Sequence, residues 1–212
     1  MEREVSTHPK TRITPGEYLA LERKAEIKSE YFDGEMFAMS GATREHNKLV
    51  LNIAADLHTQ VMDRACEVYV LDMRTKVSPT GLYTYPDIAA VCGEPRFEDE
   101  HFDTLTNPNL IIEVLSESTE SYDRGKKFAH YRTIESLREY VLVSQTERRI
   151  ERFLRQADGN WLYTEITDPN GFLELNSISC RLSMARVYHK IDFERAKREQ
   201  SEGGSVPSDR QD

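Results

Sequence analysis

The segment Asn109-Leu-Ile-Ile-Glu-Val-Leu-Ser116 constrains the fold of this chain more than any other. Its apolar run has the length and composition of a strand that is buried on both faces of a sheet. Because side chains alternate along a strand, Ile112 and Val114 should face one side of the sheet and Glu113 the other. An ionised carboxylate is costly in such surroundings unless a second group compensates its charge. The pattern therefore predicts a strand in which Glu113 has a specific partner.

A second apolar strand carries a candidate partner for Glu113. The segment Tyr85-Pro-Asp-Ile-Ala-Ala-Val91 repeats the pattern, with Asp87 near its start. If the two strands are neighbours, Asp87 and Glu113 converge. Two convergent carboxylates in an apolar sheet form either a metal site or a pair that shares one proton. Taken alone, Asp87 after a proline could also be an ordinary turn residue.

A helix predicted from about residue 120 to 133 follows the Glu113 strand and can lean over its end. It carries Asp123, Lys127 and Tyr131 at positions i, i+4 and i+8, a spacing that places them on one face. A lysine beside a metal-binding carboxylate pair could orient an attacking water or stabilise charge on a phosphate. The alternative interpretation is a surface ion pair between Asp123 and Lys127, which would stabilise the helix only slightly.

Composition bounds the class of protein. The 212 residues, 38% hydrophobic and 31% charged, are typical of a soluble globular domain. No apolar run approaches the ~18 residues of a membrane span, and the N-terminus lacks the apolar core of a secretory signal. We therefore expect a cytoplasmic protein with no membrane partner. The odd number and wide spacing of Cys66, Cys92 and Cys180 predict reduced thiols, and argue against a disulfide framework or a cysteine zinc site.

The formal net charge of −9 argues against a generally basic coat for nucleic acid. It does not exclude a local basic groove, because phosphate contacts depend on the charge at the site itself. We expect such a groove over Glu113, built from Arg124, Lys126, Lys127 and Arg74. Any DNA binding there should weaken with added salt.

The chain is expected to form a single domain over residues 14–199, between a flexible N-terminus (1–13) and a disordered tail (200–212). A capping box at Thr14 opens the first helix, and Asp33-Gly34 predicts a hairpin. The other predicted elements follow from apolar periodicity. They are a long helix capped by Thr43, strands at 67–71, 75–78 and 138–143, an acidic loop over 93–109, a hairpin of 149–154 with 161–166, and a terminal helix over 183–199.

The order and spacing of these motifs resemble the Uma-two family of endonucleases, which have the restriction-endonuclease-like PD-(D/E)XK fold. The resemblance covers roughly residues 14–190, and the block from Pro108 to Tyr140 is its most specific part. It implies an α/β fold, with a mixed central sheet flanked by helices. The residues that carry it are Asp33-Gly-Glu35, His46, Pro86-Asp87, Pro108 to Ser116, Ser118-Thr119, Asp123, Lys127, Tyr131 and Glu139-Tyr140.

The resemblance also implies a metal site. In this fold, an Asp from one strand and a Glu from the next bind Mg²⁺, for which Mn²⁺ can substitute. Asp87 and Glu113 fit these positions, together with a backbone carbonyl near Val114. The chain departs from the superfamily at Leu115, where a lysine is usual, and the family supplies its lysine from the following helix, here Lys127.

Four further residues are supporting candidates. Asp123 and Tyr131 would fix Lys127 in place. Glu35 and His46 rank below them, because Glu35 could be ordinary hairpin surface and His46 could be a capping or surface histidine near a helix start.

The sequence therefore predicts an Mg²⁺-dependent endonuclease that hydrolyses DNA phosphodiester bonds. A homodimer is the assembly that would serve cleavage of both strands of a duplex. The alternative is a non-catalytic module with a nuclease fold, which binds nucleic acid or a protein partner; Leu115 and the acidic net charge favour it. A third class, a metal-free hydrolase of small molecules, would need a nucleophile motif that the chain does not show.

Overall fold

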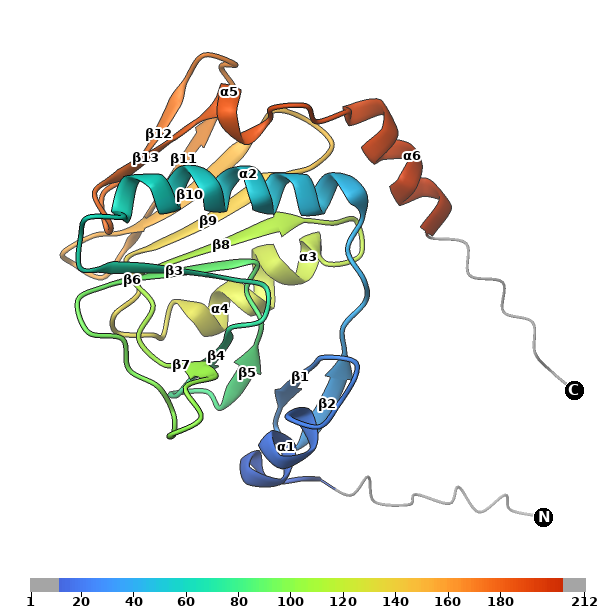
Figure 1. Ribbon diagram of the computed structural model, residues 1–212, viewed down its shortest axis with the longest axis vertical. Helices are drawn as coiled ribbons and strands as arrows, with labels where there is room; N and C mark the ends of the chain where they lie inside the picture. The colour runs from blue at the N-terminus through green and yellow to red at the C-terminus, as the bar shows by residue number, and fades with distance from the viewer. Residues whose placement is uncertain (1–11, 204–212) are drawn as a thin grey trace, which may run out of the picture.

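Two sheets form the body of the molecule, and a six-stranded sheet is its centre (Figure 1). The computed structural model describes residues 12–203. In the central sheet only β8 and β9 run parallel, and every other neighbouring pair is antiparallel. Its strands, in spatial order, are β11 (Trp161–Ile166), β10 (Ile150–Arg155), β9 (Glu139–Ser144), β8 (Leu110–Leu115), β6 (Ile88–Cys92) and β3 (Cys66–Val70).

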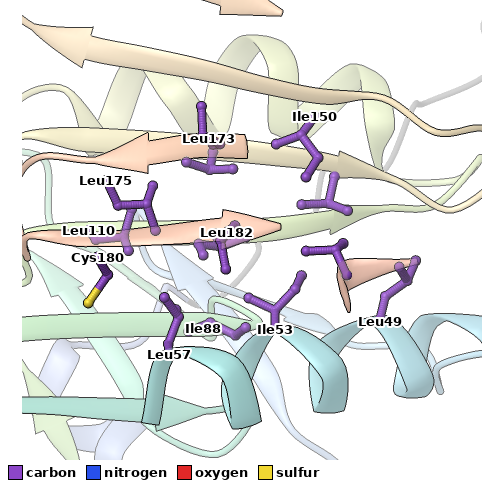
Figure 2. Packing of buried hydrophobic residues seen from close by; sticks show 14 of the residues in the cluster. Leu49, Ile53, Leu57, Ile88, Leu110, Ile150, Leu173, Leu175, Cys180 and Leu182 are labelled. Carbon is purple, nitrogen blue, oxygen red and sulfur yellow. The ribbon is translucent and has the colours of Figure 1, made fainter. Parts of the chain in front are cut away.

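The central strand β8 is buried along its whole length and alternates as expected. Leu110, Ile112 and Val114 pack into the larger apolar core, whereas Ile111 and Leu115 pack into a second core on the other face. In Figure 2, Leu49, Ile53 and Leu57 of the helix α2 (Arg44–Val61) point toward the larger core. The mixed α/β fold predicted from the sequence is confirmed.

Helices and a small sheet cover the two faces of the central sheet (Figure 1). On one face lie α2 (Arg44–Val61), α5 (Met184–Val187) and the two-stranded sheet of β12 (Phe172–Leu175) and β13 (Cys180–Ser183). On the other face lies one broken helix, made of α3 (Glu120–Tyr122), the π-helical stretch η1 (Asp123–Lys127) and α4 (Phe128–Tyr131). The last described element is α6 (Phe193–Gly203).

The second, five-stranded sheet is built from the N-terminal half of the chain. The helix α1 (Pro15–Glu22) begins at the capping box of Thr14 and packs on it. The chain leaves this sheet after β5 and enters the central sheet through Tyr85-Pro86, immediately before Asp87. The strands, in spatial order, are β2 (Glu35–Ala38), β1 (Ser29–Phe32), β5 (Leu82–Thr84), β4 (Arg74–Val77) and β7 (Thr104–Leu105).

Several boundaries differ from those predicted. The helix expected over residues 183–199 is two helices, because the chain turns between Val187 and Phe193. The helix α6 continues into the segment expected to be a disordered tail and ends at Gly203; residues 204–212, like 1–11, lie outside the described part of the chain. The acidic loop 93–109 contributes the short strand β7, which pairs parallel to β4. Among the described residues, no helix is long and apolar enough to span a membrane.

The prediction of reduced thiols is wrong for two of the three cysteines. Cys66 and Cys92 are register partners on the antiparallel strands β3 and β6, and they form a disulfide. Only Cys180 is a free, buried thiol. The sequence separation of 26 residues gave no sign that the two strands would pair. The cysteines therefore no longer support a reducing, cytoplasmic compartment.

Removing the disulfide should destabilise the protein measurably. Closing a loop of this length removes chain entropy from the unfolded state, so Cys92→Ser should lower the free energy of unfolding by about 3 kcal/mol. Urea unfolding in the absence of reductant measures the change. The matched control is the wild-type protein in excess dithiothreitol, which should unfold like Cys92→Ser. If the variant and the oxidised wild type unfold at the same urea concentration, the disulfide is not formed in solution.

Candidate active site

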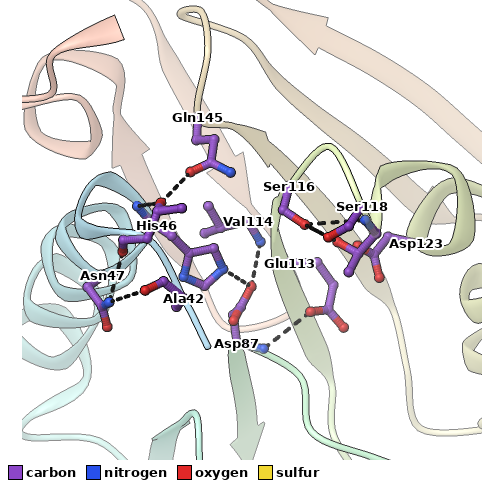
Figure 3. Close-up of polar contacts among 12 residues, drawn as sticks. Ala42, His46, Asn47, Asp87, Glu113, Val114, Ser116, Ser118, Asp123 and Gln145 are labelled. Atoms are coloured by element: carbon purple, nitrogen blue, oxygen red, sulfur yellow. Dashed lines mark hydrogen bonds and ion pairs between the residues drawn. The ribbon is translucent and has the colours of Figure 1, made fainter. Parts of the chain in front are cut away.

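Two carboxylates meet where β6 begins and β8 nears its end. The strands are antiparallel neighbours, with Ile88 opposite Ile112. The backbone N–H of Asp87 donates to Glu113 Oε2 at 3.3 Å, and the backbone N–H of Val114 donates to Asp87 Oδ2 at 2.8 Å. Figure 3 shows these two crossed contacts between the strands. The Glu113 carboxylate on β8 thus accepts from the backbone at the start of β6, and the Asp87 carboxylate accepts from the backbone of β8.

The Lys127 ammonium is the group that compensates the charge of the buried Glu113 carboxylate. Lys127 Nζ lies 2.8 Å from Glu113 Oε1, and Lys127 is only 5% exposed. Asp123 Oδ1 lies 3.5 Å from the same nitrogen, and so does Glu30 Oε1 of β1. Tyr131 completes the cluster, because its hydroxyl donates to Glu113 Oε1 at 2.9 Å. A surface ion pair between Asp123 and Lys127 is thereby excluded, since both side chains are buried.

The π-helical stretch is what carries this lysine. Asp123 and Lys127 are its first and last residues, and both are buried. A π-helix has more residues per turn than an α-helix, and it often occurs at functional sites. The neighbouring Lys126 is exposed, so the structure separates the two lysines as the helical spacing predicted.

Burial dominates the electrostatics of the cluster. It raises the pKa of Glu113 to about 8; Lys127 opposes this shift, while Asp123 and Asp87 add to it. Burial also raises the pKa of Asp123. The pKa of Lys127 is lowered by burial but raised more by Glu113 and the other acidic neighbours, so it lies well above its ordinary value. The lysine is therefore charged, and the carboxylates outnumber the cations around it.

His46 contacts the same site from the first turn of α2. Its Nε2 lies 3.2 Å from Asp87 Oδ2. The helix begins at Thr43, whose hydroxyl accepts the backbone N–H of His46 at 3.2 Å. His46 is therefore neither a mere surface histidine nor only part of a cap. Glu35, by contrast, lies in the β1–β2 hairpin opposite Phe32, and the carboxylate that reaches Lys127 from this hairpin is Glu30.

Sequence reasoning missed two residues of the site. Glu30 accepts from the Tyr122 hydroxyl at 3.2 Å and from the hydroxyl of Thr84. Gln145, at the end of β9, accepts from the Thr43 hydroxyl at 3.0 Å. In the sequence, Glu30 looks like the solvent-facing position of a hairpin, and Gln145 like the first residue of a loop. The structure alone brings them to the site.

Three of the four side chains predicted to form a basic groove over Glu113 are paired with acidic groups. Arg124 pairs with Glu120 and Glu151, and Lys127 is buried among carboxylates. Arg74 is buried and pairs with Asp103. The chain's own acidic groups therefore neutralise most of the cations near Glu113.

The carboxylates of the site suit Mg²⁺ better than a metal ion whose ligands are all protein side chains. Within the described residues, no three His, Cys, Asp or Glu side chains are arranged to hold a metal ion. Mg²⁺ is commonly bound by one or two carboxylates, with waters and substrate phosphates as its other ligands. Asp87 and Glu113 offer such a pair, and the excess of buried carboxylates around Lys127 favours an added cation.

The fold defines a class: a mixed sheet flanked by helices, as expected for a restriction-endonuclease-like protein. An acidic pair lies at the junction of two of its strands. A solved structure described as a putative nuclease belonging to DUF820, from Anabaena variabilis ATCC 29413, superposes with a TM-score of 0.66. The match covers 87% of this chain and 99% of that chain at 19% identity, so it supports the fold alone.

The sequence comparisons identify the family. The pattern of the Uma2 family, described as "Putative restriction endonuclease", matches residues 15–185, and the chain belongs to this family. Two relatives come from Synechocystis sp. (strain ATCC 27184 / PCC 6803 / Kazusa), and both are uncharacterized proteins. One, sll1609, is 39% identical over 77% of this chain and 93% of its own length. The other, slr1290, is 34% identical over 87% of this chain and 96% of its own length.

Proposed function

We propose that this protein is an Mg²⁺-dependent endonuclease that hydrolyses the phosphodiester bonds of DNA. One observation carries the proposal: a charged lysine is buried against Glu113, whose carboxylate also contacts the Asp87 backbone. A fold does not need such a cluster for stability, because burying charges costs more than packing apolar side chains of similar volume. Membership of a family described as restriction endonucleases supports the same function.

In this proposal, some residues of the site bind the metal and one stabilises charge on the phosphate. Asp87, Glu113 and the backbone carbonyl of Val114 would hold Mg²⁺, and Mn²⁺ could replace it. When bound, the metal supplies Lewis acidity and lowers the pKa of a coordinated water. Lys127 would stabilise the negative charge that develops on the phosphate, as pre-positioned cations do in phosphoryl transfer.

The supporting residues keep these groups in place. Tyr131 holds Glu113 through its hydroxyl, and Asp123 holds Lys127 from the same helical stretch. His46 orients Asp87. A two-fold homodimer would present two such sites to the two strands of a duplex.

A specific observation favours the second candidate, a non-catalytic module that binds nucleic acid or a protein partner. Three of the four predicted basic side chains, Arg74, Arg124 and Lys127, are paired with acidic ones, and the net charge is −9. Such a module would bind its partner without turnover. It would also have no need for a charged lysine beside Glu113.

Nicking of supercoiled plasmid decides between the two. The wild-type protein should convert supercoiled to open-circular DNA with Mg²⁺ or Mn²⁺, and stop when EDTA is added. Glu113→Ala should lose this activity, because the variant lacks one metal ligand. The exposed Glu165→Ala, on β11, is the matched control for a lost carboxylate. DNA binding without nicking under all metal conditions would favour the module.

A further inference from the structure

A chain of hydrogen bonds links the end of β9 to Asp87. Gln145 Oε1 accepts from the Thr43 hydroxyl, and that hydroxyl accepts the backbone N–H of His46. The imidazole Nε2 of His46 then lies 3.2 Å from Asp87 Oδ2. Asp87 in turn accepts from Val114 on β8, the strand beside β9. Figure 3 shows Gln145, His46 and Asp87 gathered around Val114.

The Gln145 side chain is buried, which is unusual for a polar residue at the start of a loop. It is only 1% exposed, and within the described part of the chain its Nε2 has no hydrogen-bond partner. A buried N–H without a partner costs free energy that an apolar side chain would avoid. The amide oxygen of Gln145 faces Thr43, whose hydroxyl accepts the backbone N–H of His46 and donates its own hydrogen to Gln145 Oε1.

We propose that Gln145 is a positioning residue of the active site, which acts through Thr43 to hold His46 against Asp87. This rests on the proposed function, because Asp87 is there assigned as a metal ligand. Thr43 is the residue at which α2 starts, so fixing its hydroxyl fixes the first turn, which carries the imidazole. The Nε2 atom of His46 faces Asp87, and its buried Nδ1 has no hydrogen-bond partner in the described residues.

The structural alternative is that Thr43 merely caps a helix. Thr14 provides the comparison within the same chain, because it caps α1 by the same contact, from the backbone N–H of Glu17 to its hydroxyl. The Thr14 hydroxyl, however, donates to Glu17 of its own helix at 2.8 Å, whereas that of Thr43 donates to Gln145, 102 residues away. A cap alone would not need this distant acceptor.

The test compares Gln145→Met and Thr43→Val with Thr43→Ser and Thr14→Val. The ¹⁵N signals of His46 in the metal-free protein report its tautomer and its bond to Asp87, and titration with Mn²⁺ reports the affinity of the site. We expect Gln145→Met and Thr43→Val to shift the His46 signals and to weaken Mn²⁺ binding ~10–100-fold, as changes behind a metal ligand do. Thr43→Ser keeps the hydroxyl, so its His46 signals and its Mn²⁺ affinity should match those of the wild type.

Thr14→Val separates positioning from capping. It should lower the melting temperature as Thr43→Val does, but leave the His46 signals and the Mn²⁺ affinity unchanged. Wild-type values in Gln145→Met would overturn the proposal, and so would equal changes in Thr14→Val. If Thr43→Val fails to fold, Gln145→Met alone decides. If the wild-type protein binds no Mn²⁺, the proposed function loses its metal, and the His46 signals still decide whether Gln145 positions the imidazole.

Discussion

Lys127→Ala should slow DNA cleavage 10²–10³-fold. Lys127 is the cation that contacts Glu113 among residues 12–203, and losing a contact to developing charge costs about 3–4 kcal/mol of transition-state stabilisation. The fold should survive, because Glu113 can take up a proton once its partner is gone: its pKa is already raised to about 8 by burial. Plasmid nicking under single-turnover conditions measures the rate, and the melting temperature checks the fold.

Lys126→Ala is the matched control for this variant. The two lysines are neighbours in sequence, but Lys126 is exposed. Its removal should leave the rate within a few-fold of wild type. A Lys127→Ala protein that cuts DNA at the wild-type rate would remove the lysine from the mechanism and favour the non-catalytic module. Equal losses in both variants would indicate a general contribution of positive charge to DNA binding.

The free energy of unfolding should fall as pH rises from about 4.5 to 8. Burial raises the pKa of Glu113 from 4.5 to about 8, so the folded protein binds this proton more tightly than the unfolded chain does. The stabilisation is complete below pH 4.5 and is lost as pH rises through 8. The slope approaches about 1.4 kcal/mol per pH unit for one proton. The raised pKa of Asp123 acts in the same direction, whereas Lys127 stays charged throughout this window.

Urea unfolding at a series of pH values measures this slope, and Glu113→Gln tests its origin. The glutamine does not titrate, so the variant should lose most of the slope while keeping a side chain of the same shape. Added Mg²⁺ should flatten the wild-type slope, because it binds the deprotonated carboxylate and displaces the proton. A slope that Glu113→Gln leaves unchanged would show that Glu113 is not its origin.

Much of the site could be predicted because its parts lie within short segments. Glu113 stood out as a carboxylate in the middle of an apolar segment. That segment forms the strand β8, which is buried at every position as expected. The helical spacing of Asp123, Lys127 and Tyr131 placed all three beside that carboxylate, although a π-helical stretch interrupts the helix. Asp87 was found because it precedes a second apolar strand.

The residues that were missed reach the site from distant segments. Glu30 comes from a hairpin in the other sheet, and its alternation with buried Tyr31 made it look like surface. Gln145 reaches Thr43 across 102 residues. Cys66 and Cys92 pair only because β3 lies beside β6 at that register. None of these contacts has a pattern that can be recognised within one segment.

The sequence by itself determined the elements: helix starts at Thr14 and Thr43, the hairpin at Asp33-Gly34, and the buried strand of Glu113. These depend on residue types a few positions apart, because caps, turns and side-chain alternation are local. Only the tertiary structure decided which carboxylates surround Lys127, which side chain holds the start of α2, and which cysteines are bonded. Those contacts depend on the order of strands in the sheets, which no local spacing specifies.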